Sequence, residues 1–317
     1  MKNKIIFLLL IILITSCTSN NNNDAELEKD LYKGTQGVIL EYFENNFPDE
    51  VFENEKLDYA VKLTNKGPYT AHNIRLLVSL EKGYMTFASD PEALTNIKVR
   101  EIAPLEGKTI FNPLDDFDVV ELPMIVKSLD DLSEYHDTVI LTTLCYDYKG
   151  IAIADVCIDP DPFDTTSREK ECNLKESISL SGGQGGPVVI DKIETRMMVN
   201  DDSTVSPQFK IYVTNQGQGT VLKEGTTRLV CNKESATTEV YNIVRISKIQ
   251  FSEFTKKDFN CIPEDLVLRN EQDFITCTLE KSVNENYAYQ TPLTVEIVYG
   301  YTESSSKEIK IKKILPY

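Results

Sequence analysis

The chain has 317 residues and a formal net charge of −17, from 50 acidic and 33 basic side chains. A single hydrophobic core stops growing well before this length, so the sequence favours two domains. A nucleic-acid partner is not expected, because a polyanion is bound by a basic stripe and none is visible in the sequence. The acidic balance instead suits an exposed protein that must stay soluble.

Residues 1–16 have the features of an export signal. Two lysines precede the apolar run Ile5–Ile14, whose ten residues are about half of the roughly 20 needed to cross a bilayer. The following letters ITSC, ending in Cys17, resemble a lipobox, after which prokaryotic lipoprotein signals are cut and the cysteine receives lipid. Cys17 is therefore the expected lipid attachment site. The alternative is an ordinary signal peptide cut near Ser16, which leaves Cys17 free.

Residues 17–33 are polar and have no hydrophobic period, which predicts a flexible tether. Together with the signal, this tether predicts an exported protein of the cell envelope, held by lipid on the outer side of the membrane. Six cysteines remain after Cys17, and an even set in an exported protein usually forms disulfides.

One short phrase occurs twice in the chain, as VKLTNKG at Val61–Gly67 and as IYVTNQG at Ile211–Gly217. Around each copy, apolar and polar residues alternate with period two, which is typical of a half-buried strand. Each strand ends in Asn-x-Gly, residue types that tolerate positive φ and close tight turns. The repeat therefore predicts the same strand and turn in two copies of one domain.

The repeat extends on both sides of this phrase. An apolar triplet lies 23 residues before each copy, and VILTTLCYDY at Val139–Tyr148 matches PLTVEIVYGY at Pro292–Tyr301. Many short alternating strands without a βαβ rhythm favour antiparallel sandwiches. The predicted fold is all-β, with two tandem immunoglobulin-like β-sandwich domains at residues 34–160 and 181–317, joined by a connection at residues 161–180.

A family resemblance accompanies this layout. The stretches GTQGVILEYFENNFPDEVFENEKLDYAVKLTNKG, VCIDPDPFDTT and SGGQGGPVVI are similar to those of uncharacterised archaeal or bacterial cell-surface proteins built from a pair of CARDB-type immunoglobulin-like domains. The resemblance implies the fold and the location. The family has no established catalytic residues to transfer to this chain.

Few residues suggest enzymatic chemistry. The two histidines, His72 and His136, lie at predicted surface positions without a nearby nucleophile or orienting group, so neither is expected to be catalytic. The glycine-rich segment Ser181–Pro187 precedes a strand rather than a helix, which favours a turn over a phosphate-binding loop. Hence no enzyme activity is expected.

Four carboxylates cluster where the first domain ends, at Asp155, Asp159, Asp161 and Asp164. Calcium takes six to eight oxygen ligands, and acidic segments between β domains can supply them. The spacing matches no EF-hand, so a solvated, proline-kinked linker is the competing interpretation. No cofactor is expected, and calcium at these carboxylates is the alternative.

The cysteines suggest two short disulfide loops. Cys157 with Cys172, and Cys261 with Cys277, would each close a loop of about 15 residues. Cys145 is then left with Cys231, either buried, bonded to each other or available to a neighbour; six cysteines permit 15 connectivities.

Two groups of aromatic residues need an assignment. Tyr146 and Tyr148, like Tyr299 and Tyr301, share a face with buried neighbours and are predicted to pack in the core, although an outward platform for a sugar or protein is possible. The long segment between Glu81 and Pro123 differs between the two copies, and its candidate partner-binding anchors are three aromatic residues. These are Tyr84, Phe87 and Phe111.

These observations predict a non-enzymatic, envelope-anchored surface protein that serves as an interaction or scaffold module for a protein or glycan partner. A glycan- or calcium-binding adhesin module is the alternative. A secreted enzyme or inhibitor is a weaker one.

Overall fold

The computed structural model describes residues 31–43, 48–92, 95–165, 170–201, 204–232, 237–284 and 287–314. Within them, β-strands dominate and the helices are short. Every strand pair is antiparallel except that of β2 with β18. The predicted all-β class with antiparallel sheets is therefore confirmed.

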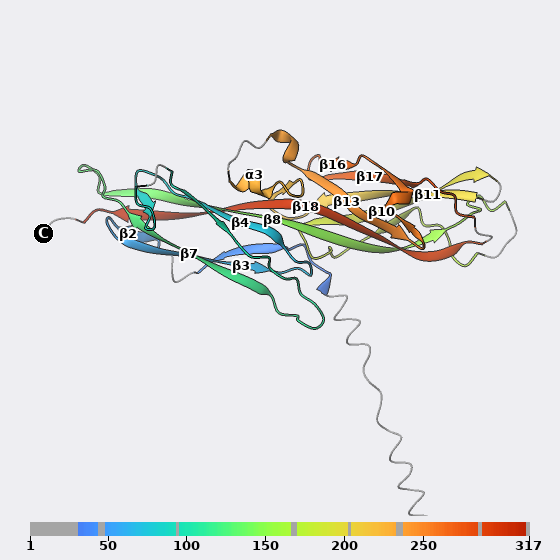
Figure 1. The fold of residues 1–317 in the computed structure, drawn as a ribbon, viewed down its shortest axis with the longest axis horizontal. Helices are drawn as coiled ribbons and strands as arrows, with labels where there is room; N and C mark the ends of the chain where they lie inside the picture. The colour runs from blue at the N-terminus through green and yellow to red at the C-terminus, as the bar shows by residue number, and fades with distance from the viewer. Residues whose placement is uncertain are drawn as a thin grey trace, which may run out of the picture.

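Two long strands form the axis of the molecule (Figure 1). β8 (Tyr135–Ile158) and β18 (Tyr289–Lys312) each have 24 residues and pair along their whole length. They are the centre of a nine-stranded sheet of order β14-β13-β18-β8-β4-β6, in which β2 and β12 also pair with β18, and β16 with β13. The other strands of this sheet are β2 (Glu50–Phe52), β4 (His72–Ser79), β6 (Ile97–Glu101), β12 (Thr220–Leu222), β13 (Ile243–Phe251), β14 (Phe254–Thr255) and β16 (Asp265–Val267).

Two smaller sheets have the orders β1-β3-β7-β5 and β15-β17-β11-β10-β9. The first consists of β1 (Val38–Tyr42), β3 (Lys56–Asn65), β5 (Met85–Phe87) and β7 (Asp116–Val126). The second consists of β9 (Ser177–Ser179), β10 (Val188–Asp201), β11 (Thr204–Asn215), β15 (Phe259–Ile262) and β17 (Gln272–Leu279). Short helical segments connect the strands at α3 (Thr227–Cys231), η3 (Thr238–Val240) and η4 (Lys256–Asp258).

Both smaller sheets cover the same face of the nine-stranded sheet. The even-numbered residues of β8 from 140 to 158 are all buried, so the covered face does not change along the strand. At one end the Tyr59 hydroxyl of β3 lies 2.7 Å from the Thr142 hydroxyl of β8. At the other end the Phe209 ring of β11 packs on Phe251 of β13, with centroids 5.7 Å apart. We call the end under the four-stranded sheet the first half and the other end the second half.

The sequence did not reveal that the last strand of each repeat runs on into the other half. β8 pairs with β4 from Leu141 to Asp147 and no further. Its last ten residues, Lys149–Ile158, lie in the second half and pair with residues 289–298 of β18. Conversely, residues 302–312 of β18 pair with the beginning of β8 in the first half, and the last three of them with β2. The halves therefore share two continuous strands.

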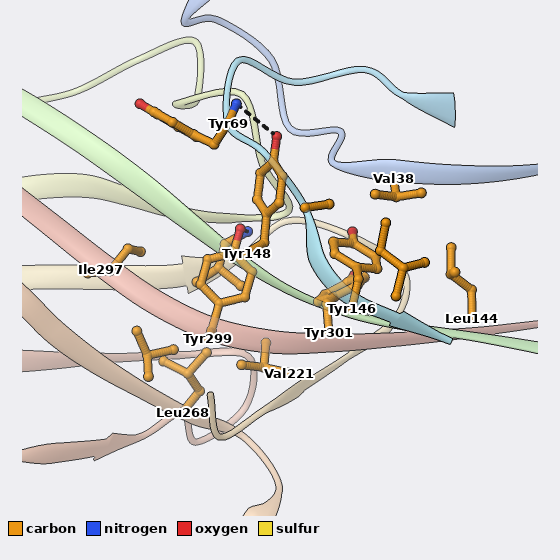
Figure 2. Packing of buried hydrophobic residues seen from close by; sticks show 14 of the residues in the cluster. Val38, Tyr69, Leu144, Tyr146, Tyr148, Val221, Leu268, Ile297, Tyr299 and Tyr301 are labelled. Atoms are coloured by element: carbon orange, nitrogen blue, oxygen red, sulfur yellow. Dashed lines mark hydrogen bonds between the residues drawn. The ribbon is translucent and has the colours of Figure 1, made fainter. Parts of the chain in front are cut away.

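Four tyrosines meet where these strands cross from one half to the other (Figure 2). Tyr148 faces Tyr299 and Tyr146 faces Tyr301 in the strand register, on either side of the Asp147–Gly300 pair. The paired rings have centroids 6.4 and 5.8 Å apart, respectively. All four are buried, and burial raises their pKa values, that of Tyr301 to about 12. The predicted core position of these tyrosines is thus confirmed.

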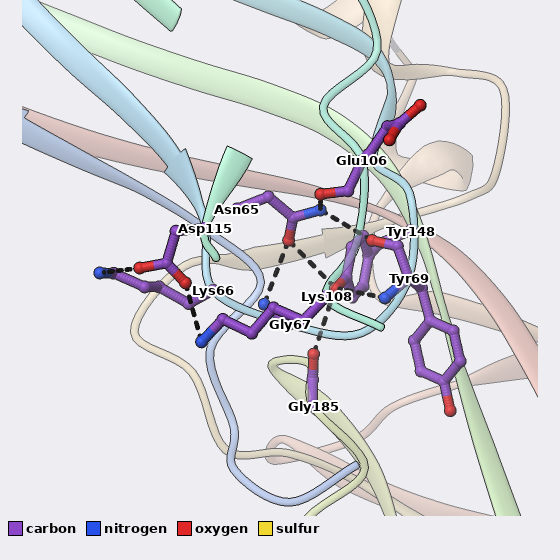
Figure 3. A network of polar contacts seen from close by, with 9 residues as sticks. All are labelled: Asn65, Lys66, Gly67, Tyr69, Glu106, Lys108, Asp115, Tyr148 and Gly185. Atoms are coloured by element: carbon purple, nitrogen blue, oxygen red, sulfur yellow. Dashed lines mark hydrogen bonds and ion pairs between the residues drawn. The ribbon is translucent and has the colours of Figure 1, made fainter. Parts of the chain in front are cut away.

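The repeated Asn-x-Gly turns hold two of these tyrosines, Tyr148 and Tyr301; Figure 3 shows the first copy. The Asn65 carboxamide oxygen accepts hydrogen bonds from the Gly67 N–H at 3.2 Å and the Tyr148 hydroxyl at 3.3 Å. In the second copy, the Asn215 oxygen accepts the same two bonds, from the Gly217 N–H and from the second copy's tyrosine hydroxyl. The phrase recurs because each half needs this bonded pair.

The reason for glycine in these turns differs from the expected one. Neither Gly67 nor Gly217 has a positive φ. A Cβ on Gly67 would lie 2.0 Å from the Gly185 carbonyl oxygen and 2.2 Å from the Tyr148 hydroxyl, and one on Gly217 2.1 Å from the Tyr301 hydroxyl. The glycines therefore make room for the tyrosines and, at Gly67, also for the Gly185 backbone, and the positive-φ interpretation is wrong.

Three disulfides crosslink the described chain. Cys157–Cys172 and Cys261–Cys277 join the cysteines that the sequence analysis paired. The third, Cys145–Cys231, fixes α3 to the uncovered face of β8. Disulfides form and persist in oxidising compartments, so three of them indicate an extracellular or similarly oxidising environment. Among the described residues, no helix has the length and apolar character to cross a membrane.

The tyrosine packing gives a first prediction. Gly67→Ala and Gly217→Ala should each lower the free energy of unfolding by about 1–3 kcal/mol, because the added methyl group overpacks the core. Gly83→Ala is the matched control, since its φ is not positive and a Cβ there meets nothing within 4 Å. Urea unfolding of the three variants measures the difference. Equal stability of all three would contradict the close-packing account.

Candidate interaction surface

The second half of β8 is a free sheet edge. Residues Lys149–Ile158 pair with β18 on one side, and on the other side no described strand pairs with them. An unpaired edge presents a row of backbone N–H and C=O groups that can template another strand. This segment could therefore accept an extended chain by strand addition.

The equivalent edge of β18 has a different composition. Tyr148 and Tyr301 occupy the same place in the repeat. Ile153 and Ser306 each follow the corresponding tyrosine by five residues, so they are equivalent positions. Between β12 and β2, β18 likewise has no described strand paired on its outer side, where the Tyr42 hydroxyl donates to the Ser305 carbonyl oxygen at 3.3 Å. Its residues 303–308 are serine, lysine and glutamate, and Lys307 pairs with Asp49 at 3.1 Å. Charges of this kind protect natural edges from unwanted pairing.

The free edge of β8 lacks such protection. Its sequence is KGIAIADVCI, in which only Lys149 and Asp155 are charged. The side chain of Ile153 is 63% exposed, whereas Ala152 and Ala154 face the core. Of two equivalent edges in one chain, one is blunted and the other is open and apolar.

A groove of about 840 Å³ lies beside this edge. One wall is formed by Ile151 and Ile153, and the other by Leu180 just after β9. Tyr32 and Tyr69 also line it, with ring centroids 6.1 Å apart. The groove thus runs between the edges of the two sheets of the second half, where an added strand would bury its apolar side chains.

A larger groove of about 1010 Å³ lies along β10. Its lining carries charges of both signs, from Glu176, Glu194, Arg196 and Lys210. Lys210 and Lys192 both pair with Glu194, at 3.9 and 2.8 Å. Because Glu194 and Lys210 are already paired within the protein, this groove has fewer unpaired groups for a partner than the open edge of β8.

The loop that carries Asp159, Asp161 and Asp164, called the Asp-Pro loop below, contains a lysine ammonium in the place considered for calcium. Lys170 Nζ lies 2.6 Å from a carboxylate oxygen of Asp159, 2.6 Å from one of Asp164 and 2.7 Å from the backbone oxygen of Asp161. Burial disfavours the charged ammonium, but these two carboxylates outweigh it and raise the pKa of Lys170. Asp155 is exposed on β8.

No group of three or more His, Cys, Asp or Glu side chains suited to a metal occurs among the described residues. In the described part of the Asp-Pro loop, the Lys170 ammonium forms ion pairs with Asp159 and Asp164 next to the Cys157–Cys172 disulfide. A cation contributed by the chain itself offsets part of the charge of these carboxylates.

The histidines lie apart from each other. His136 Nε2 lies 3.1 Å from Glu81, and its ring stacks on Tyr84 with centroids 3.4 Å apart. His72 is exposed in a polar cleft of about 590 Å³ near Asp147.

Asp147 lies at the floor of this cleft. Burial raises the pKa of its carboxyl group. This effect outweighs the hydrogen bonds from Asn73 Nδ2 at 2.7 Å and from the Gly225 N–H at 3.2 Å, which lower the pKa. One of its oxygens thus attaches the segment before α3 to β8, and the other accepts from Asn73 of β4. This arrangement is structural in character.

The three predicted aromatic anchors have different surroundings. Phe87 is 3% exposed within β5, so its prediction as a surface anchor is wrong; all three residues of that short strand are buried, and Phe87 belongs to the core. Tyr84 is half-buried against His136. Phe111 is 91% exposed and is the one anchor of the three that is fully available.

The free edge of β8 was not predicted from the sequence. The signal was present, because the apolar run after Tyr148 contrasts with the polar run TESSSKE after Tyr301 in an otherwise matching repeat. What the sequence lacked was the pairing partner of each strand, which decides whether such a run is an edge.

Comparisons with known proteins find distant likenesses only. No protein family matches the chain, and no curated protein does. A sporulation control protein of Bacillus subtilis, Spo0M, has 10% identity and a TM-score of 0.16, over 56% of this chain and 80% of its own. The secreted serine protease VesC of Vibrio cholerae has 8% identity and a TM-score of 0.18, over 90% and 53%.

The serine-rich repeat adhesion glycoprotein Srr1 of Streptococcus agalactiae has 12% identity and a TM-score of 0.18, over 92% of this chain and 100% of its own. TM-scores this low do not indicate a shared fold. No argument about function is therefore taken from these proteins.

The ion-pair cluster predicts the response to calcium. Millimolar calcium, or its removal with EDTA, should leave the melting temperature unchanged, because the Lys170 ammonium already occupies the position between the Asp159 and Asp164 carboxylates. Differential scanning fluorimetry at constant ionic strength measures this, with magnesium as the control. A calcium-specific rise of several degrees that disappears in the Asp159→Asn variant would show that the loop is a calcium site.

Proposed function

We propose that this chain is a non-enzymatic surface protein, anchored in the cell envelope by lipid on Cys17, whose two halves are immunoglobulin-like sandwiches of the CARDB type. It acts as an interaction module that captures an extended segment of another envelope protein along the free edge of β8. The observation that carries the proposal is the contrast between this apolar edge and the charged, equivalent edge of β18.

The edge favours a protein chain as partner. Strand addition supplies backbone hydrogen bonds without a demand on partner sequence, and side-chain pockets add selectivity. Here Ile153 is exposed on one face of the strand, and the groove between Ile151 and Leu180 lies beside it. A partner strand with alternating apolar residues would bury them in this groove.

The position of the groove favours a neighbour in the envelope. Its lining includes Tyr32 and Lys33, where the predicted tether joins the folded part. A partner held there would lie close to the anchored end of the chain. The three disulfides support an oxidising, extracytoplasmic location for this contact.

A glycan is the second candidate partner. Tyr32 is 45% exposed at the groove, and an exposed ring there could stack on a sugar. Such binding would use the aromatic ring and would not depend on the β8 backbone. A Tyr32→Ala variant that loses binding while an edge variant keeps it would favour the glycan.

The anchor can be tested by changing Cys17. The Cys17→Ser protein should lose lipid and move from the membrane fraction to the soluble exported fraction, because the apolar run of the signal is too short to anchor the mature chain. Mass spectrometry of the N-terminal peptide detects the lipid directly. An unmodified Cys17 in protein recovered from source cells would remove this part of the proposal.

Cross-linking in intact source cells tests the edge. A photo-reactive amino acid at position 153 should give a single defined adduct with an envelope protein, whereas one at the equivalent position 306 should give none. A second experiment replaces Ile153 with lysine, which adds the type of charge that blunts natural edges. The Ile153→Lys protein should lose the partner, and Ser306→Lys, the matched control, should keep it. Equal adducts from both positions, or none from either, would overturn the proposal.

A further inference from the structure

One loop of the first half presents bare apolar side chains to solvent. It lies between Leu105 and β7, and its tip, Thr109–Leu114, is exposed at every residue. Phe111 is 91% exposed, Leu114 75% and Ile110 43%. We call Thr109–Leu114 the apolar tip. Three large apolar side chains within five residues are unusual on an acidic protein of this charge.

The base of this loop is firmly held (Figure 3). Asp115 lies between two lysines, 2.6 Å from Lys66 Nζ and 2.8 Å from Lys108 Nζ. Burial opposes ionisation of this carboxyl group, but the two ammonium groups outweigh it and lower its pKa. The Lys108 N–H also donates to the Gly67 carbonyl oxygen at 3.0 Å.

The apolar tip itself is a closed turn. The Thr109 N–H donates to the Asn112 carbonyl oxygen, and the Asn112 N–H donates to Thr109 Oγ1, each at 2.9 Å. The exposure of Phe111 and Leu114 is therefore built into a hydrogen-bonded turn. Its counterpart in the second copy is much shorter, because only residues 268–271 separate β16 from β17, the strand that pairs with β11 as β7 pairs with β3.

This loop lies next to the point where the described chain begins. The Lys66 N–H bonds the Gly37 carbonyl oxygen at 2.9 Å, and Lys66 is in turn part of the loop's base. Figure 1 shows the loop projecting from the same side of the molecule as the first described residues, which are drawn in blue. Only 13 residues separate Leu31 from Cys17, a span of at most about 45 Å when fully extended.

We infer that the apolar tip inserts into the outer surface of the lipid bilayer beside the Cys17 anchor, and thereby fixes how the protein stands on the membrane. This inference rests on the proposed lipid anchor. A convex tip with three apolar side chains fits a fluid lipid surface, which adapts to it, whereas a protein partner would need a matching pocket. Because Asp115 pairs with Lys66 and Lys108, and the neighbouring Glu106 and Asp116 add two further negative charges, the insertion is apolar and does not depend on anionic lipid.

The chain offers a clean probe for this insertion. It contains no tryptophan, so a Phe111→Trp variant carries a single indole at the tip. Leu132 is 100% exposed in the segment between β7 and β8, so Leu132→Trp is the matched control at a site away from the tip. Cys17 is also the only cysteine outside the three disulfides, so it can be coupled to a maleimide lipid in phosphatidylcholine vesicles.

The measurement is tryptophan emission from the mature chain, residues 17–317, coupled to vesicles with and without brominated lipid. The Phe111→Trp protein should show blue-shifted emission and lose roughly half of it to bromine, since an inserted ring lies about 5–10 Å deep. Adding Ile110→Ser and Leu114→Ser should abolish most of this quenching. The Leu132→Trp protein should remain unquenched.

Two outcomes would overturn the inference: no quenching in either tryptophan variant, or equal quenching in both. Because the anchor is attached chemically, neither outcome depends on whether cells add lipid to Cys17. Failure of the tip and failure of the proposed anchor are therefore distinguishable. Equal results with added phosphatidylglycerol would confirm that the contact is apolar.

Discussion

The pairing of β8 with β18 is the constraint on which the rest of the structure depends. These strands remain hydrogen-bonded partners over 24 residues, from Tyr135 opposite Lys312 to Ile158 opposite Tyr289. Each smaller sheet covers only one end of such a ladder, and the buried residues beneath the two sheets form one continuous hydrophobic core. The tyrosines at the crossing, with Asn65 and Asn215 bonded to two of them, join the parts of this core under the two sheets.

This shared ladder also explains why free edges exist. A strand that leaves its own half enters the other half as the outermost strand, and both β8 and β18 do so. The two exposed edges differ in composition. The β18 edge has serines and the Lys307–Asp49 pair, and the β8 edge has isoleucines and alanines. Both edges face the same risk of unwanted pairing, but only the β18 edge is protected by charge. This difference supports the proposal that the β8 edge binds a partner strand.

Local patterns in the sequence predicted much of this architecture. Period-two alternation identified β3 and β11, the core position of Tyr146 and Tyr299 followed from the same parity, and the short spacing of Cys157 and Cys172 indicated a disulfide. These properties depend on neighbours within a few residues. Features that depend on pairing between strands far apart in the sequence were not predicted. The alternation of apolar and polar residues does not determine which strand lies beside Lys149–Ile158.

The surface was harder to predict for the same reason. Phe87 and Phe111 are both aromatic residues in one irregular segment, but one is in a buried strand and the other at a loop tip. The ammonium that neutralises Asp159 comes from Lys170, eleven residues away across the disulfide-closed loop. Charge and composition alone suggested calcium there.

The central claim is that the two halves are one cooperative unit because they share β8 and β18. Differential scanning calorimetry of the mature, disulfide-intact chain tests it most directly. A single transition whose calorimetric enthalpy equals its van't Hoff enthalpy is predicted, since melting either half breaks the ladder that the other half needs. Two resolved transitions, or a calorimetric enthalpy well above the van't Hoff value, would show that the halves unfold independently and would contradict the account.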